Sequence, residues 1–290
     1  MALPAKLDQE IQTAVSTLKA SLSCIEEQAE SHRAILVSGW GASPKVIAAV
    51  ATYLVGLLAS AISRTLEVRA QLEDTDRDRL ELVQNVERIV GRANAPLSLD
   101  QKQDQRNPWI AEGLWHLCLF LANHIENVHP LGEIIAMDLP HISAKDHGLD
   151  VLALYQTADS VGISIVECKA YETDPNKAIS HATETFRRID DGTHDARIRQ
   201  AVAAMRSALP KSLQDRISPS LWKNVRAYIP NPHYDAAKSM NWQKKRPVFG
   251  NLAVSRERIV VMPHAIPNFA QFFDDVAAAM LWIAKGLPDV

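Results

Sequence analysis

An alternation of helical and β-rich segments in the C-terminal two-thirds of the chain constrains the fold most. A strongly apolar segment with proline at its start, PWIAEGLWHLCLFLANHIENV, predicts a helix from residue 108. Five later segments are short, apolar and rich in β-branched residues: residues 132–139, 148–155, 161–169, 225–229 and 258–262. Helical spacing returns over residues 175–207 and 269–285. This order predicts an α/β domain over residues 101–290, with a mixed β-sheet flanked by helices.

Residues 1–100 are expected to form a helical N-terminal region. Apolar residues recur at helical spacing over residues 5–36, and residues 64–93 predict a charged helix with a Leu/Val stripe. The stretch GWGASPK at residues 39–45 is interpreted as a turn, because a phosphate-binding P-loop ends in Gly-Lys-Ser/Thr. Residues 98–107 are polar and are expected to link the two regions.

The uncharged run at residues 46–63 has two interpretations. It is flanked by Lys45 and Arg64, and its length is near the lower limit of about 17–18 residues for a membrane span. Its alanines, serines and glycine, and the lack of an aromatic belt, favour a buried helix over a membrane segment. We therefore expect no membrane contact.

Composition excludes several classes of protein. With 47% hydrophobic residues, 11 Gly and 15 Pro among 290 residues, the chain is neither disordered nor collagen-like. Cys24, Cys118 and Cys168 are odd in number and far apart, which excludes a disulfide framework and a paired zinc knuckle. The N-terminus turns polar at once and lacks the apolar core of a signal peptide, so a cytoplasmic location is expected.

Charge is distributed unevenly along the chain. The formal net charge is −3, but residues 101–176 hold 4 Lys+Arg against 11 Asp+Glu, and residues 177–258 hold 16 against 7. An acidic segment is thus followed directly by a basic one. Carboxylates beside a cationic surface suit an enzyme that holds a metal against a polyanion. A solvated surface of mixed sign is the alternative.

The segment HGLDVLALYQTADSVGISIVECKAY, residues 147–171, predicts a β-hairpin with its tip between Ala158 and Asp159. Paired residues then have numbers that sum to 317, which places Asp150 directly opposite Glu167. Their Cβ atoms would be about 4.5–5.5 Å apart. Because side chains alternate along a strand, Lys169 would project from the same face as Glu167.

Two ionised carboxylates that face each other are destabilising unless a positive charge lies between them. Oxygen ligands of this kind favour Mg²⁺, with Mn²⁺ as a substitute, held by Asp150 and Glu167. The backbone carbonyl of Cys168 could add a ligand. Lys169 could orient or deprotonate a metal-bound water, or stabilise charge on a scissile phosphate. The implied chemistry is metal-assisted hydrolysis of a phosphodiester.

Gly148-x-Asp150, followed after 16 residues by Glu167-x-Lys169, resembles the PD-(D/E)xK nuclease superfamily over about residues 108–190. This resemblance implies a restriction-endonuclease-like fold in which the Asp and Glu bind the metal and the Lys is catalytic. Leu149 stands where the proline of the family name would be. The family often adds a glutamate from the preceding helix, for which Glu112 fits best and Glu133 is the rival.

Residues 145–150 (KDHGLD) and 131–133 (LGE) also resemble the nuclease subunit of Hachiman-type anti-phage defence systems. That resemblance implies DNA as substrate and a superfamily 2 helicase as partner. The alternative is a non-catalytic nucleic-acid-binding or regulatory subunit of a helicase complex. The choice between DNA and RNA, between endo- and exonuclease, and the need for a partner all stay open.

Other candidates have weaker support. His116 and His124 lie in an apolar segment without metal-ligand spacing and are interpreted as core or surface histidines. His147 could contact phosphate or simply belong to a loop. The basic and aromatic residues that could face nucleic acid, or form ordinary surface, are Lys177, His181, Arg187 and Arg188 on a helix, and Tyr234, Asn241, Trp242, Lys244, Lys245 and Arg246 in a loop.

Overall fold

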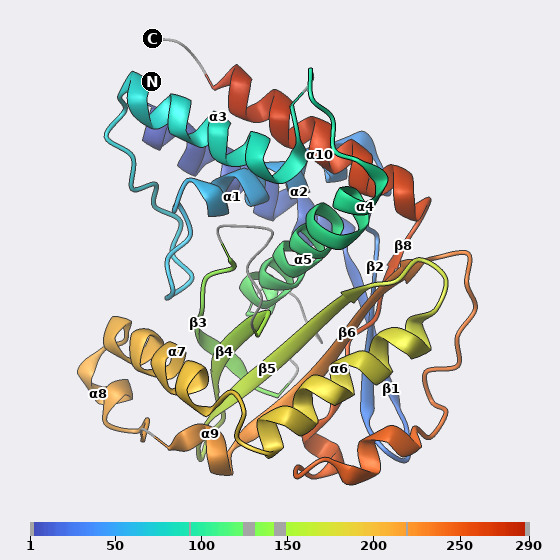
Figure 1. Ribbon diagram of the computed structural model, residues 1–290. Helices are drawn as coiled ribbons and strands as arrows, with labels where there is room; N and C mark the ends of the chain where they lie inside the picture. Colours follow the sequence, from blue (N-terminus) through green and yellow to red (C-terminus); the bar gives the residue numbers. More distant parts are fainter. Residues whose placement is uncertain (1–2, 93, 124–130, 142–148, 219, 288–290) are drawn as a thin grey trace.

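The computed structural model has a mixed α/β fold and describes residues 3–92, 94–123, 131–141, 149–218 and 220–287 (Figure 1). Its helices are α1 (Leu3–Ser21), α2 (Pro44–Leu58), α3 (Asp76–Val90), α4 (Leu99–Gln101), α5 (Asn107–Leu121), α6 (Pro175–Asp190), α7 (Asp195–Ala208), α8 (Lys211–Gln214), α9 (Leu221–Asn224) and α10 (Phe269–Gly286). A π-helical turn, η1 (Lys102–Arg106), and two 3₁₀ turns, η2 (Pro247–Asn251) and η3 (Arg256–Arg258), complete the helical elements of these residues. The strands are β1 (Ser23–Gln28), β2 (Arg33–Ser38), β3 (Glu133–Met137), β4 (Val151–Gln156), β5 (Val161–Ala170), β6 (Arg226–Asp235), β7 (Val260–Val261) and β8 (His264–Ile266).

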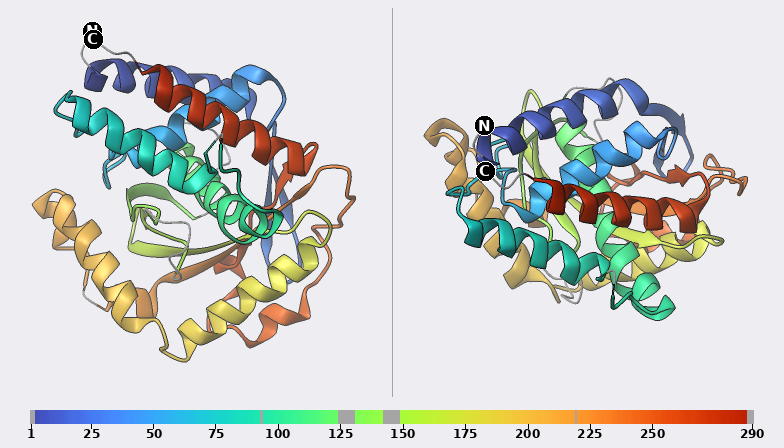
Figure 2. Two further views of the ribbon diagram at one scale, coloured as in Figure 1. Left: turned by 45° about the horizontal axis from the view of Figure 1, so that its top comes forward. Right: turned by 90° about the horizontal axis from the view of Figure 1, so that it is seen from above.

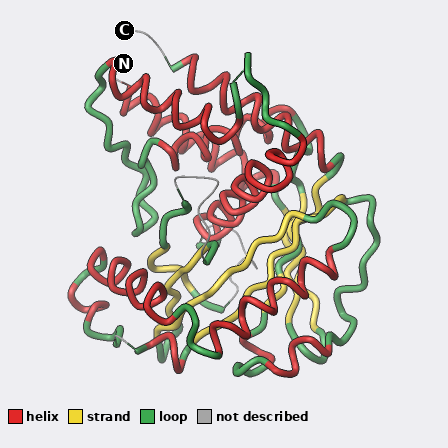
Figure 3. The backbone as a smooth tube through the Cα atoms, in the orientation of Figure 1, coloured by secondary structure: helices red, strands yellow, loops and turns green. Residues whose placement is uncertain are grey.

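The strands form one mixed sheet in the order β1-β2-β8-β6-β5-β4-β3, with β7 beside β2. β3, β4 and β5 are antiparallel neighbours, whereas β5, β6, β8 and β2 run parallel. Helices lie on both faces of the sheet (Figure 3). The predicted α/β class, with a mixed sheet flanked by helices, is therefore confirmed.

Side chains of β5 alternate between two hydrophobic clusters. Val166 and Cys168 belong to the cluster that contains the apolar residues of α5, whereas Ile163 and Ile165 belong to the cluster that contains α6. This alternation follows from the two-residue period of a strand. Because β5 is buried on both faces, it reads as a continuous apolar run in the sequence until Glu167.

The prediction of one helix over residues 5–36 is wrong beyond Ser21. Residues 23–28 and 33–38 form the hairpin β1–β2. β2 continues into the main sheet, where Val37 pairs with His264 and Arg33 with Val260. The partners of β2 are supplied by the other end of the chain, so local helical spacing could not reveal them.

Two further helix boundaries differ from the prediction. The helix expected over residues 64–93 is confined to α3, because Thr75 caps its N-terminus in a reciprocal pair with Asp78. The predicted linker at residues 98–107 is helical instead. Its start is fixed by a second capping box, in which Ser98 and Gln101 bond each other's backbone N–H groups.

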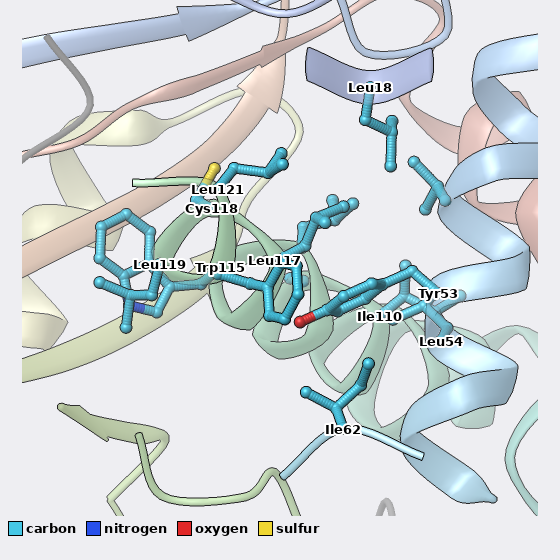
Figure 4. Close-up of a cluster of buried hydrophobic side chains, with 14 of the residues drawn as sticks. Leu18, Tyr53, Leu54, Ile62, Ile110, Trp115, Leu117, Cys118, Leu119 and Leu121 are labelled. Carbon is cyan, nitrogen blue, oxygen red and sulfur yellow. The ribbon is translucent and has the colours of Figure 1, made fainter. Parts of the chain in front are cut away.

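The apolar run at residues 46–63 forms most of α2, which is packed between α1 and α10 (Figure 2). Tyr53 and Leu54 of α2 lie beside Ile110 of α5 (Figure 4). Residues on both sides of the predicted boundary at residue 100 share this buried cluster. Among the helices that the structure describes, none has the length and apolarity needed to cross a membrane.

Candidate functional site

The register of the β4–β5 hairpin is the one predicted. Val151 pairs with Val166, and Gln156 with Val161, so paired numbers sum to 317. The N–H of Thr157 bonds the carbonyl of Ser160 at 2.8 Å and closes the turn. One position beyond the Val151–Val166 pair, toward the open end of the hairpin, the same register places Asp150 beside Glu167.

Hydrogen bonds and ion pairs connect Asp150, Glu167 and Lys169 at the open end of the hairpin. Asp150 Oδ2 accepts from the backbone N–H of Cys168 at 2.6 Å. Lys169 Nζ donates to Glu167 Oε1 at 2.6 Å and lies 3.9 Å from Asp150 Oδ2. Thr185 of α6 donates its hydroxyl to the same Oε1 atom at 3.1 Å. The predicted placement of Glu167 and Lys169 on one face is confirmed.

Glu112 reaches this cluster from α5, on the helix that precedes the strands. Its side chain is buried, and Oε1 accepts from the backbone N–H of His141 at 3.4 Å. Glu133, the rival glutamate, is exposed at the start of β3. It accepts from Gln156 Nε2 at 2.6 Å, beside the turn and thus at the opposite end of the hairpin. The structure therefore brings Glu112 to the site and leaves Glu133 away from it.

Burial raises the pKa of all three carboxyl groups, and repulsion from neighbouring carboxylates adds to the rise in Glu167 and Glu112. Burial, followed by the charge of Asp150, raises the pKa of Glu167 to about 7, although Lys169 opposes the rise. Burial and the charges of Asp150 and Glu167 raise the pKa of Glu112 well above its ordinary value. Burial also raises the pKa of Asp150, against the opposing effect of Lys169. The Lys169 ammonium group is paired with Glu167 and Asp150, and all three carboxyl groups are costly to ionise.

The pKa of Lys169 is raised as well, which for an amine favours the charged form. Burial alone would lower its pKa, but the charges of Glu167 and Asp150 outweigh that effect and raise it. The ammonium group is therefore protonated in this arrangement. It lies between the two carboxylates that the hairpin register places opposite each other.

The donor atoms fit a divalent cation in part. Glu167 Oε2 is buried and accepts no hydrogen bond from the described residues, and the charge of Asp150 acts on the same carboxyl group. A hard cation satisfies such oxygen atoms. Across the described ranges, no group of three His, Cys, Asp or Glu side chains is arranged to hold a metal ion. Asp150 and Glu167 would therefore need a further ligand from the backbone or from water.

The backbone carbonyl of Cys168 is placed to supply such a ligand, because it points toward the Asp150 side of β5. The N–H and C=O of one strand residue point toward the same neighbour. Since the Cys168 N–H is bonded to Asp150, its carbonyl also points toward that side. The predicted metal-ligating role of this carbonyl stays a prediction that the backbone permits.

Sequence reasoning missed three residues around the cluster: Thr185, His141 and Arg197. Thr185 lies four residues after His181 on α6, so helical spacing from that candidate would have found it. Arg197 of α7 places Nη2 3.1 Å from His141 Nε2 and 3.4 Å from the carbonyl oxygen of Leu149. No local signal predicts this contact, because it depends on how α7 packs against the sheet.

The basic candidates of α6 lie at its surface. Lys177 is exposed and lies 5.6 Å from the centroid of the Tyr171 ring. The hydroxyl of Tyr171 is 2.7 Å from His181 Nδ1. Arg187 is half-buried and donates to the carbonyl of Val248 at 3.2 Å, whereas Arg188 is exposed.

Of the interpretations left open for residues 241–246 and Tyr234, stacking of the aromatic side chains on bases is contradicted by their burial. Trp242 and Tyr234 are buried, with ring centroids 5.5 Å apart. The guanidinium of Arg246 lies 5.4 Å from the Trp242 ring. The backbone carbonyl of Trp242 contacts His32 of the distant N-terminal segment. The side chains of Trp242 and Tyr234 are packed in the core. Asn241, Lys244 and Lys245 are exposed.

The remaining candidates belong to the core or lie outside the described residues. His116 is buried in α5, and its Nδ1 is 2.9 Å from the Tyr53 hydroxyl. His124, His147 and Gly148 lie outside the described residues. The three cysteines are free, as expected.

Neither a scan against models of known protein families nor a search of curated proteins found a match to this chain. Its function is therefore inferred from the arrangement of its own residues.

Proposed function

We propose that this chain is a metal-dependent nuclease that hydrolyses DNA phosphodiester bonds with Mg²⁺, or with Mn²⁺ as a substitute. One observation carries the proposal. The hairpin register sets Asp150 opposite Glu167, with Lys169 between them and a buried Glu167 oxygen that lacks a hydrogen-bond donor among the described residues. Buried carboxylates with too few positive charges are costly to fold, and a divalent cation would offset that cost.

Each residue of the cluster has a role in this proposal. Asp150, Glu167 and the Cys168 carbonyl would hold the metal, and Glu112 would assist through its charge. A bound divalent cation supplies a water of lowered pKa and polarises a phosphoryl oxygen. Lys169 orients the attacking water and stabilises negative charge on the phosphate. Its raised pKa favours this role over proton removal.

The substrate is proposed from charge and from resemblance. The segment after the hairpin is basic, and α6 presents Lys177 and Arg188 at its surface. DNA, rather than RNA, follows only from the resemblance to defence nucleases. Because the net charge is −3, the isolated chain neutralises few phosphates. We therefore propose that a helicase partner delivers the DNA, in a cytoplasmic anti-phage complex.

The test is cleavage of plasmid and single-stranded DNA by purified protein with Mg²⁺ or Mn²⁺. Lys169→Met and Glu167→Gln should abolish cleavage, because each removes a charge from the cluster. Glu133→Gln is the matched control: it changes an exposed glutamate of the same hairpin sheet and should cleave like the wild type. Glu112→Gln should lose activity, which separates the two candidate helical glutamates.

Two outcomes would contradict the proposal. Equal cleavage by the wild type and Lys169→Met would show that the activity comes from another site or from a contaminant. Absence of cleavage, with and without a co-purifying helicase, would favour the alternative of a non-catalytic subunit that binds nucleic acid.

A further inference from the structure

Arg197 connects α7 to both sides of the carboxylate cluster. Its Nη2 atom donates to His141 and to the carbonyl oxygen of Leu149. A guanidinium group can only donate, so the facing imidazole nitrogen of His141 must accept. The backbone N–H of His141 holds Glu112, and Leu149 directly precedes Asp150. Arg197 is therefore bonded to the immediate neighbours of two of the three carboxylates.

The charge of Arg197 affects the carboxyl groups of the cluster, although Arg197 forms no ion pair with them. Burial is the main cause of the raised pKa of Glu112 and of Asp150, and Arg197 is among the charges that oppose the rise in both. Arg197 nevertheless forms no ion pair within 4.0 Å with a carboxylate of the described residues. Toward these residues only Nη2 is engaged in hydrogen bonds. The side chain is exposed, and its Nε and Nη1 groups form no hydrogen bond with the described residues, so they can donate to a ligand.

We infer that Arg197 binds a non-bridging oxygen of the substrate phosphate beside the metal-binding carboxylates. This role rests on the proposed nuclease function and adds a substrate-contacting residue to it. A guanidinium presents its N–H groups in a planar fork that matches two phosphate oxygens, which an ammonium does not. Lys169 and Arg197 would then place positive charge on both sides of a phosphate held by the metal, where charge develops during hydrolysis.

A purely structural role for Arg197 predicts different behaviour. If Arg197 only held the segment that carries His141 and Leu149, its loss would displace Glu112 and Asp150 and weaken metal binding. If it binds phosphate, its loss removes a positive charge from the vicinity of the carboxylates. Metal affinity would then stay the same or rise, while substrate binding and cleavage would fall.

The experiment compares the wild type with Arg197→Gln, Arg197→Lys and Arg199→Gln. Arg199 is exposed on the same helix, and no hydrogen bond or ion pair joins it to the described residues of the site, so Arg199→Gln controls for net charge. Three quantities are measured for each protein: Mn²⁺ affinity by calorimetry, binding of a fluorescent single-stranded oligonucleotide with Mg²⁺ present, and the cleavage rate.

Arg197→Gln should bind the oligonucleotide about 3–10-fold more weakly and cleave it at least about 100-fold more slowly. Its Mn²⁺ affinity and melting temperature should not fall. Arg197→Lys should recover part of the binding but little of the rate, and Arg199→Gln should resemble the wild type. The inference is overturned if Arg197→Gln binds and cleaves like the wild type, or if its Mn²⁺ affinity falls together with cleavage. It is also overturned if the wild type does not bind the oligonucleotide even at low ionic strength, where contacts with phosphate are strongest. A wild type that binds no Mn²⁺ refutes the proposed function itself.

Discussion

Glu167→Gln should stabilise the metal-free protein at alkaline pH, although it should abolish the proposed activity. Glu167 is almost fully buried, and its pKa is raised to about 7, first by burial and then by Asp150. In the unfolded chain this carboxyl group ionises near its ordinary value of 4.5. The folded state therefore binds a proton more tightly than the unfolded state, and stability falls as pH rises from about 4.5 to about 7.

The magnitude follows from the difference between these two pKa values. At 1.36 kcal/mol per pKa unit, the change from 4.5 to about 7 corresponds to about 3 kcal/mol at pH 8. At pH 5 most of this penalty is absent, and less than about 1 kcal/mol remains. A glutamine resembles the protonated side chain, and its oxygen can still accept from Lys169 and Thr185. The variant should therefore gain up to about 3 kcal/mol at pH 8 and much less at pH 5.

The assay is urea denaturation of both proteins with EDTA at pH 8 and pH 5. Glu133→Gln, at an exposed position, should change the free energy of unfolding by less than about 0.5 kcal/mol at either pH. The reasoning is refuted if Glu167→Gln is no more stable than the wild type at pH 8. That result would mean that Lys169 already compensates Glu167, so that the cluster has no unmet need for a cation.

Three further predictions concern the rest of the fold. Burial lowers the pKa of His116 to about 3, so the unfolded state binds a proton that the folded state does not as pH falls below 6.5. When the pH is lowered from 7.5 to 5.5, the free energy of unfolding of His116→Asn, measured by urea denaturation, should therefore fall by about 1.4 kcal/mol less than that of the wild type. An identical pH dependence of the two proteins would contradict this. Asp190→Ala should cost about 3–5 kcal/mol in thermal unfolding because it leaves Arg226, bonded at 2.5 Å, without its carboxylate; a loss below about 1 kcal/mol would argue against a buried ion pair. Gly113→Ala should cost about 1–3 kcal/mol, because its Cβ would overlap Leu54 Cδ2 between α5 and α2, and an unchanged melting temperature would show that Leu54 moves freely.

The part of the site that could be predicted from the sequence is the part that is local in the chain. The turn at residues 157–160 sets the hairpin register, and the register alone sets Asp150 beside Glu167. Glu112 lies on the helix that precedes the strands, and α5 packs against β5. The preference for Glu112 over Glu133 came from the family resemblance, which implies a glutamate on the helix before the strands.

The features that escaped prediction depend on contacts between distant segments. β2 finds its partners in β7 and β8, at the other end of the chain. Trp242 is turned inward and its carbonyl contacts His32, so its aromatic ring is unavailable to a nucleic-acid base. Arg197 reaches the site because α7 packs against β3 and β4. Residue type and spacing carry no record of such packing.

The most direct test of the central claim is a calorimetric titration of Mn²⁺ into the purified protein at neutral pH. The wild type and Glu133→Gln should each bind one ion per chain at the carboxylate cluster, and Asp150→Asn should lose that binding. Absence of binding by the wild type, or unchanged binding by Asp150→Asn, would contradict the metal site and with it the proposed nuclease mechanism.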